Sequence, residues 1–221
     1  MFVPLMLFGQ YEIKLTNSNY ADVDVKFTSS NYADTDVRFV SSEYSADFTV
    51  GFTNSKSKAT VAITDNNYAD LDIKITESNY ADIDIKITES HYADVDIMIK
   101  TSGIVDYLIY SDKYLDKNEI IVACLPIIKT YTDDKIEKDK IPLFFKDCGE
   151  ILSPTYNTNI SDEFEGWDFD NAVYELDNGL SVSSNTYEYT YSYRPSIQLY
   201  YCNGWYASVD GKKLESVIVY K

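Results

Sequence analysis

Residues 79–100 have the sequence NYADIDIKITESHYADVDIMIK, in which one phrase of twelve residues occurs twice. Tyrosines recur at separations of twelve or a multiple of twelve, at positions 20, 32, 44, 68, 80 and 92. Copies of the phrase begin at these tyrosines and at Lys56, which makes seven, and weaker copies flank them, FGQYEIKL from Phe8 and IVDYLIY from Ile104. The N-terminal half of the chain is therefore an internal repeat.

Each copy alternates apolar and polar side chains. In YADVDVKF, the copy that begins at Tyr20, the inward apolar set is Ala21, Val23, Val25 and Phe27, and the outward set is Tyr20, Asp22, Asp24 and Lys26. This alternation predicts a half-buried strand followed by a short polar turn such as TSSN. The copy ADFTVGF starts one residue late and its turn is one residue short, so the inward set is kept as Ala46, Phe48, Val50 and Phe52.

The aspartates constrain how the copies pair. A single copy buries too little apolar surface to be stable alone, so the copies must share hydrogen bonds and one interior. A straight, in-register β-helix would set Asp22 beside Asp34, and two carboxylates one strand apart repel by roughly 1 to 4 kcal/mol. Pairing that sets Asp beside Lys removes this repulsion. The sequence therefore disfavours an in-register β-helix and favours a pairing that sets Asp beside Lys, for example between antiparallel neighbours.

The repeat phrase S-x-Y-A-D-h-x-h-K-h, where h is apolar, occurs in SNYADIDIKI and, with one residue inserted after the Tyr and Gly in place of the Lys, in SEYSADFTVGF. It resembles the bacterial septoil-knot family, which is built from short repeated strands whose path is described as a seven-crossing knot and which has no assigned activity. The resemblance covers about residues 8–126 and includes the late variant YSDKYLDKNEIIVA, residues 110–123. Lys56–Lys58 in place of Tyr–Asp, and Gly51 in place of Lys, depart from the family pattern.

The rest of the chain has a different pattern. Residues 127–157 mix charges of both signs, and Pro142 blocks a long helix, so we expect a connector with a strand or one turn of helix. Residues 158–221 contain five or six strand-like runs, with a hairpin turn at Asp177–Gly179 and another at Asp210–Gly211. These runs predict a small barrel.

The motifs EFEGW, ELDNG, YRP and VDG in this part also resemble a small bacterial SH3-like domain of unknown role, with Leu180 where a Gln is expected. We expect an all-β protein with a strand-repeat domain (1–126), a connector (127–157) and an SH3-like β-barrel (158–221).

The net charge and the cysteines indicate which partners and which cellular compartment to expect. The formal net charge is −17, which disfavours binding to nucleic acids and to anionic membrane surfaces. Cys124, Cys148 and Cys202 predict reduced, buried thiols in the cytoplasm, with one disulfide plus a free thiol as the alternative. The apolar start MFVPLMLF is interpreted as a core strand rather than a shortened export signal. We expect a cytoplasmic protein, with secretion as the alternative.

Catalytic constellations are missing from the sequence. The single histidine, His91, stands where other copies have Asn, which predicts a turn residue and leaves Ser or Cys nucleophiles without their usual base. No Cys/His cluster suits zinc, and no glycine-rich loop suits phosphate. A hydrolase using Glu163, Glu165 or Asp168 is a weaker hypothesis. We predict no enzyme, no cofactor and no metal.

Binding is the remaining class of function. TYEYTYSYRP alternates so that Tyr187, Tyr189, Tyr191 and Tyr193 share one face, which could stack a sugar or dock a proline-rich peptide, or could pack within the barrel. The candidate ligand-binding residues are Trp167, Tyr189, Tyr191, Tyr193 and Trp205. The repeat aspartates, which are predicted to cap turns or alternatively to bind calcium, are Asp22, Asp34, Asp70, Asp82 and Asp94.

We therefore expect a non-enzymatic structural or binding protein, a rigid repeat scaffold that carries a small SH3-like module for a protein partner. The alternative is a secreted surface protein that is stabilised by calcium or binds carbohydrate.

Overall fold

The computed structural model describes residues 11–132, 136, 141–145, 148–152, 154–166, 172–184, 191–210 and 212–221. One compact unit contains Met1–Thr132 and Lys138–Ile151, and the other contains Asp133–Glu137 and Leu152–Lys221. The core strand expected at the N-terminus and much of the expected connector lie outside the described residues.

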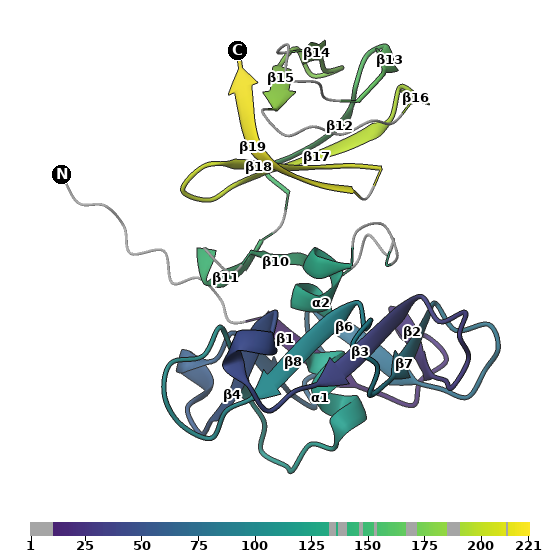
Figure 1. Ribbon diagram of the computed structural model, residues 1–221, viewed down its shortest axis with the longest axis vertical. Helices are drawn as coiled ribbons and strands as arrows, with labels where there is room; N and C mark the ends of the chain where they lie inside the picture. Colours follow the sequence, from purple (N-terminus) through teal and green to yellow (C-terminus); the bar gives the residue numbers. More distant parts are fainter. Residues whose placement is uncertain are drawn as a thin grey trace. The chain divides into compact units, whose positions relative to one another are not determined.

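Nine strands of the described chain form a closed, parallel barrel in the first unit (Figure 1). They are β1 (Tyr11–Leu15), β2 (Val23–Phe27), β3 (Thr35–Phe39), β4 (Phe48–Thr53), β5 (Val61–Ile63), β6 (Leu71–Ile75), β7 (Ile83–Ile87), β8 (Val95–Ile99) and β9 (Tyr107–Tyr110). Short 3-10 turns occupy Glu43–Ser45 and Lys56–Lys58. The existence of the predicted strands is confirmed, including those of the two weaker copies, but the strands are shorter than expected. β2, for example, begins at Val23, so Tyr20 and Ala21 of its copy belong to the preceding loop.

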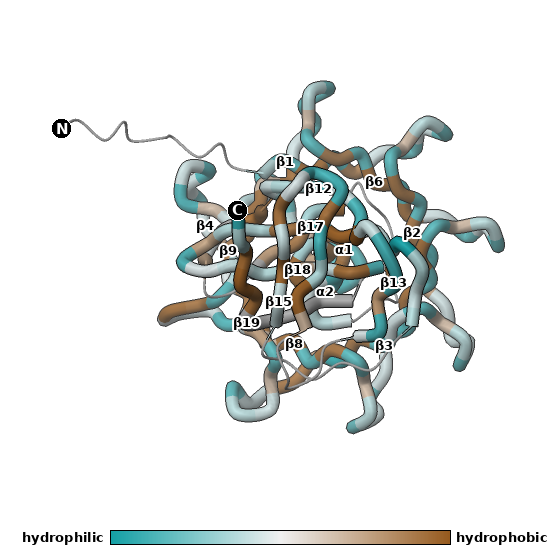
Figure 2. The backbone as a smooth tube through the Cα atoms, turned by 90° about the horizontal axis from the view of Figure 1, so that it is seen from above, coloured by the Kyte–Doolittle hydropathy of each residue, from teal (hydrophilic) through white to brown (hydrophobic). Residues whose placement is uncertain are grey.

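The order around the ring is β1-β5-β9-β4-β8-β3-β7-β2-β6, and β6 returns to β1. Consecutive strands of the chain lie two positions apart in this ring and always in the same direction, so the chain makes almost two circuits. Each connection crosses outside the one strand that lies between its ends, and the loops radiate from the barrel (Figure 2). The loop from β1 to β2, for example, crosses β6, where the Asp22 N–H donates to the Asp72 carbonyl at 2.8 Å.

The expected pairing of Asp beside Lys is confirmed, but the strands that achieve it are parallel and not antiparallel, which was the example given. Each strand is parallel to its neighbours and displaced from them by two residues, so Asp24 stands opposite Lys74 on one side and Lys26 opposite Asp84 on the other. The stagger alternates the charges across the wall without reversing any strand. Strand direction was not determined by the charge pattern, because two different arrangements satisfy it.

The apolar face points inward as predicted at the middle of each strand. Val23 and Val25 are fully buried, as are Phe48 and Val50 in the copy with the shifted register. Phe52 is 48% exposed, so its predicted inward placement is wrong. It lies near the end of β4, beyond the part of the strand that the barrel interior covers.

Two short helices of the described chain, α1 (Lys117–Ala123) and α2 (Leu125–Tyr131), fill the barrel and correct the all-β prediction (Figure 2). An Asp116–Glu119 capping box starts α1. Every residue from Ile120 to Ile128 is buried, as expected for a helix that is enclosed on all sides. The Tyr107 hydroxyl on β9 donates to the Ala123 carbonyl at 3.0 Å. Residues 117–131 therefore form a helical plug, and residues 117–123 are not a further strand copy.

Beyond α2, the short strands β10 (Leu143–Phe145) and β11 (Glu150–Leu152) form a two-stranded sheet. The Phe144 N–H donates to the Thr130 hydroxyl at 3.0 Å, and Lys129 Nζ donates to the Ile141 carbonyl at 2.8 Å. These bonds attach the strand segment to the last turn of the plug.

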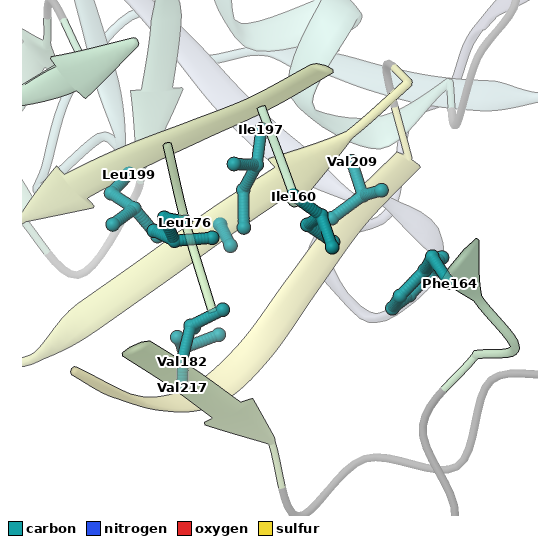
Figure 3. Close-up of a cluster of buried hydrophobic side chains, with 9 residues drawn as sticks. Ile160, Phe164, Leu176, Val182, Ile197, Leu199, Val209 and Val217 are labelled. Atoms are coloured by element: carbon teal, nitrogen blue, oxygen red, sulfur yellow. The ribbon is translucent and has the colours of Figure 1, made fainter. Parts of the chain in front are cut away.

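The second unit is a six-stranded antiparallel half-barrel in its described residues. Its order is β12 (Tyr156–Asn159), β17 (Ser196–Tyr201), β18 (Trp205–Val209), β19 (Lys212–Tyr220), β15 (Ser181–Ser184) and β14 (Val173–Glu175), with β13 (Glu163–Phe164) paired separately to β16 (Ser192–Tyr193). Its apolar core includes Ile197, Leu199 and Val182 (Figure 3).

The hairpin predicted at Asp177–Gly179 is confirmed between β14 and β15. The Leu176 N–H donates to the Leu180 carbonyl at 2.8 Å, and Gly179 has a φ of 80°, which favours glycine. An isolated bridge between Ile160 and Leu176 connects the end of β12 to the end of β14. Gly211 of the second predicted turn lies outside the described residues, while β18 and β19 pair as expected.

The prediction of three reduced thiols is wrong. Cys148 and Cys202 form a disulfide, and Cys124 in the plug is the free, buried cysteine of the described chain. The alternative of one disulfide plus one thiol is the correct one, and the wide spacing of the cysteines gave no signal of the pairing. Within the described residues, no helix has the length and apolarity to cross a membrane.

Candidate functional site

The structure describes three of the five predicted ligand-binding residues. Tyr191 and Tyr193, at β16, are 64% and 68% exposed. Trp205 on β18 is half-buried and packs partly against the core of the half-barrel. Trp167 and Tyr189 lie outside the described residues, as does Tyr187 of the predicted stripe.

Trp205 belongs to a different aromatic cluster from the one predicted. Its ring stacks on Tyr156 with centroids 6.0 Å apart, and it tilts against Tyr201 at 5.0 Å. Trp205 pairs with Tyr201 at the end of β17, whereas Tyr193 precedes the start of that strand. Since β17 has six residues and strands rise about 3.3 Å per residue, the two aromatic groups lie at opposite ends of the strand.

The acids considered for hydrolysis lie on the surface. Glu163 and Glu165 are exposed, and Asp168 lies outside the described residues. A hydrogen bond to the Glu163 carboxylate, together with that charge, raises the pKa of Tyr191. Glu163 is thus a partner of an exposed tyrosine.

Most of the barrel loops have the same set of local hydrogen bonds. In the first, the Ser18 N–H donates to the Thr16 hydroxyl at 3.1 Å, and the Tyr20 N–H donates to the Ser18 hydroxyl at 3.0 Å. Asn19 accepts a hydrogen bond from Lys74 of the crossed strand at 2.8 Å. Matching bonds recur in the loops that carry Tyr32, Tyr68, Tyr80 and Tyr92 and hold these tips in one conformation, whereas Tyr44 lies in the 3-10 turn Glu43–Ser45.

His91 follows the same plan, in the loop that crosses β3. It lies in the turn before Tyr92 and contacts Arg38, which replaces the lysine of other copies. The prediction of a turn residue is confirmed.

The repeat aspartates fasten each loop to the strand it crosses. Asp34 accepts a hydrogen bond from the Asp84 N–H at 2.7 Å, while its own N–H donates to the Asp84 carbonyl at 2.9 Å. The carboxylates accept backbone N–H groups as expected, but these belong to a strand about 50 residues away rather than to the same turn. The described residues contain no group of three or more His, Cys, Asp or Glu that could hold a metal ion.

The residues at the loop tips are almost fully exposed. Six repeat tyrosines of the described chain have exposed fractions between 91% and 104%: Tyr20, Tyr32, Tyr44, Tyr68, Tyr80 and Tyr92. Ile104 holds the same position in the last loop and is 91% exposed. The sequence placed these tyrosines on the outer face but did not distinguish them from the wall residues, because their exposure depends on how far the loops project.

The six tyrosines are neighbours in space. In ring order, the crossed strands β8, β3, β7, β2, β6 and β1 lie beneath the loops of Tyr44, Tyr92, Tyr32, Tyr80, Tyr20 and Tyr68, respectively. These strands are adjacent, so the tyrosines occupy consecutive loops. We call this set the tyrosine arc. It ends at the loop of Ile104 on one side and at the uncrossed strand β5 on the other.

Lys56, which stands in place of the repeat tyrosine, lies in a loop outside the tyrosine arc. Lys56 forms an ion pair with Glu12 at 2.5 Å, and the pKa of Glu12 is lowered by hydrogen bonds from Lys56 and Asn66. A hollow of about 350 Å³ lies here, lined in part by Lys56, Tyr110 and Lys113. The arc therefore leaves out the two loops in which Lys56 and Ile104 stand in place of the tyrosine.

A scan against models of protein families finds no match to this chain, and a search of curated proteins finds none either.

Proposed function

We propose that this chain is a non-enzymatic binding protein, in which a rigid barrel holds the tyrosine arc out to a macromolecular partner. The observation that carries the proposal is the near-complete exposure of six repeat tyrosines on consecutive loops. Tyrosine is enriched where proteins bind one another, since it offers a large amphipathic surface and loses little conformational entropy.

The composition of the loops supports this function. TNSNYA, TSSNYA and TESNYA combine Tyr with Ser and Asn, the residue types that dominate the binding loops of antibodies. Hydrogen bonds within the loops of Tyr20, Tyr32, Tyr68, Tyr80 and Tyr92 fix these tips before any partner arrives, which lowers the entropy lost on binding. The tips do not pack on one another, so binding would add up over several weak contacts.

The winding of the chain is consistent with the septoil-knot resemblance. A chain that goes almost twice round a closed ring, with each connection crossing outside one strand, is wound as a torus knot is. We therefore propose that the barrel belongs to that knotted architecture and that its role is to act as a rigid scaffold.

The half-barrel is proposed as an SH3-like second interaction module. Its exposed aromatics support this role: Tyr191 and Tyr193 at one end of β17, and Tyr156 with Tyr201 beside Trp205 at the other. The disulfide between Cys148 and Cys202 supports an oxidising compartment over the cytoplasm. We therefore favour an exported binding protein, without a role for calcium.

The test compares the full chain with a variant in which all six arc tyrosines are changed to serine. Both are applied to an array of peptides and glycans. The full chain should retain ligands of at least one class, and the variant should bind them at least about tenfold more weakly. Protection of the Cys124 thiol reports that the barrel and its plug are intact in both. Equal binding by an intact variant would exclude the arc as the binding surface.

A matched control places the same kind of change in the other unit. Tyr191, Tyr193 and Tyr201 are exchanged for serine while the arc is left unchanged. Loss of binding in this control alone would assign the function to the half-barrel.

A further inference from the structure

We propose that the partner of the tyrosine arc is a basic polypeptide, whose Lys or Arg side chains enter the spaces between neighbouring loop tips. This inference rests on the proposed function and adds the chemical class of the partner.

Carboxylates alternate along the arc. Three tip tyrosines follow an exposed acid by three residues: Tyr68 after Asp65, Tyr80 after Glu77, and Tyr92 after Glu89. Tyr20 and Tyr32 have the neutral Asn17 and Ser29 at that place.

The ring order interleaves the two kinds of loop. From Tyr92 to Tyr68 it runs acidic, neutral, acidic, neutral, acidic, because the chain lays its second circuit between the strands of the first. Each pair of neighbouring tips from Tyr92 to Tyr68 therefore shares one carboxylate.

The lysines of the wall do not cancel this charge. Lys74 Nζ donates to Asn19 at 2.8 Å and Lys26 Nζ to Asn79 at 2.7 Å, so these lysines lie beside two of the tips, but acids outnumber bases in the barrel. Residues 11–132 contain 20 Asp and Glu against 11 Lys and Arg. The barrel thus attracts cations and repels polyanions.

Cations also suit the tyrosines themselves. A Lys or Arg side chain is attracted to the face of a tyrosine ring, and a carboxylate beside that ring adds an ion pair. The tips lie farther apart than the ~4.8 Å between strands, since the loops radiate outward. A partner that carries cations at intervals along a chain can contact several tips, whereas a small cation can contact one.

The test uses poly-L-lysine as the probe and dextran as the neutral polymer. One variant removes the arc carboxylates (Asp65→Asn, Glu77→Gln, Glu89→Gln). A control variant makes the same change of charge in the other unit at three exposed acids (Asp162→Asn, Glu165→Gln, Glu175→Gln). The full chain should bind poly-L-lysine, and more weakly as salt is raised. The arc variant should lose about tenfold in affinity, and the control variant less than about twofold.

The remaining outcomes separate the two proposals. Equal losses in both carboxylate variants would mean attraction by overall charge alone, which overturns the inference. If dextran is bound and the six-serine variant loses it while poly-L-lysine is not bound, the partner is a glycan and the proposed function stands. Unchanged binding of poly-L-lysine by the six-serine variant would overturn the inference, and the array test then decides the proposed function separately.

Discussion

At the scale of single residues, each repeat aspartate accepts a backbone hydrogen bond of the kind that a neighbouring strand accepts in a sheet. Asp34 and its equivalents accept an N–H from the strand beneath their loop, so the loop and the strand share two hydrogen bonds. A backbone N–H that loses its acceptor is costly when it is covered by protein.

Asp34→Ala should therefore lower the free energy of unfolding by about 1 to 2 kcal/mol, because the Asp84 N–H loses its partner. Asp34→Asn keeps an oxygen acceptor and should lose less. Urea unfolding of both variants measures the difference. Glu77→Ala, at an exposed loop position, is the control and should stay close to the parent. An Asp34→Ala variant as stable as the control would show that this bond contributes nothing.

Gly51 shows a second adjustment between a loop and a strand. It stands where other copies have Lys, and an added Cβ would meet both γ-methyl groups of Val105 at 3.0 Å. Val105 in turn stands where other copies have Ala, in the loop that crosses β4. A larger loop residue and a smaller strand residue thus occur at the same contact.

Gly51→Ala should destabilise the barrel by about 1 to 3 kcal/mol through overpacking. Combining it with Val105→Ala should recover part of that loss, and a double-mutant cycle from unfolding curves measures the coupling. Gly204→Ala is the control, because nothing lies within 4 Å of the added Cβ there. Purely additive effects of the two changes would contradict the contact.

At the scale of elements, the plug formed by α1 and α2 fills the interior of the barrel. Its helices are too short to be stable alone in water, so burial inside the ring of strands must stabilise them. Burial also raises the pKa of the Cys124 thiol, which keeps the reactive thiolate scarce. The thiol is therefore a reporter of the plug.

Ile121→Ala should lower the free energy of unfolding by about 2 to 5 kcal/mol, because a fully buried side chain leaves a cavity. Labelling of Cys124 by a thiol reagent should be negligible in the parent and faster in the variant. Tyr80→Ser, at an exposed tip, is the matched control and should leave both measurements unchanged. Rapid labelling of the folded parent would contradict an enclosed plug.

At the scale of the whole molecule, carboxylates dominate the charge but do not gather into a metal site in the described residues. The aspartates that could have formed calcium columns are separated by the stagger of the strands and accept backbone N–H groups. The net charge of −17 is then spread over the surface.

We therefore expect neither excess EDTA nor added calcium to shift the melting temperature of the full chain, because no site would bind the ion more tightly in the folded state. Added magnesium, at the same ionic strength as the calcium, is the control for screening of surface charge. A rise in melting temperature with calcium but not with magnesium would reinstate the calcium hypothesis.

Much of the barrel could be predicted from local pattern. The alternation around Val23 and Val25 determined both the strand and its inner face, and the Asp177–Gly179 turn was fixed by three residues. The plug was missed because a short run of buried apolar residues has no amphipathic period and does not distinguish helix from strand. The sequence analysis grouped Trp205 with Tyr193 as candidate binding residues because they are near in sequence. In the structure they lie at opposite ends of β17.

The sequence by itself determined the strands, their buried faces and the need to place Asp beside Lys. Only the tertiary structure decided that the strands are parallel, that they close into a ring around two short helices, and that six tyrosines occupy exposed tips of consecutive loops. The physical reason is that strands paired in the barrel are about 50 or 58 residues apart in the chain. Because the copies are almost identical, local chemistry cannot choose among their possible neighbours, and only closure of the whole barrel makes that choice.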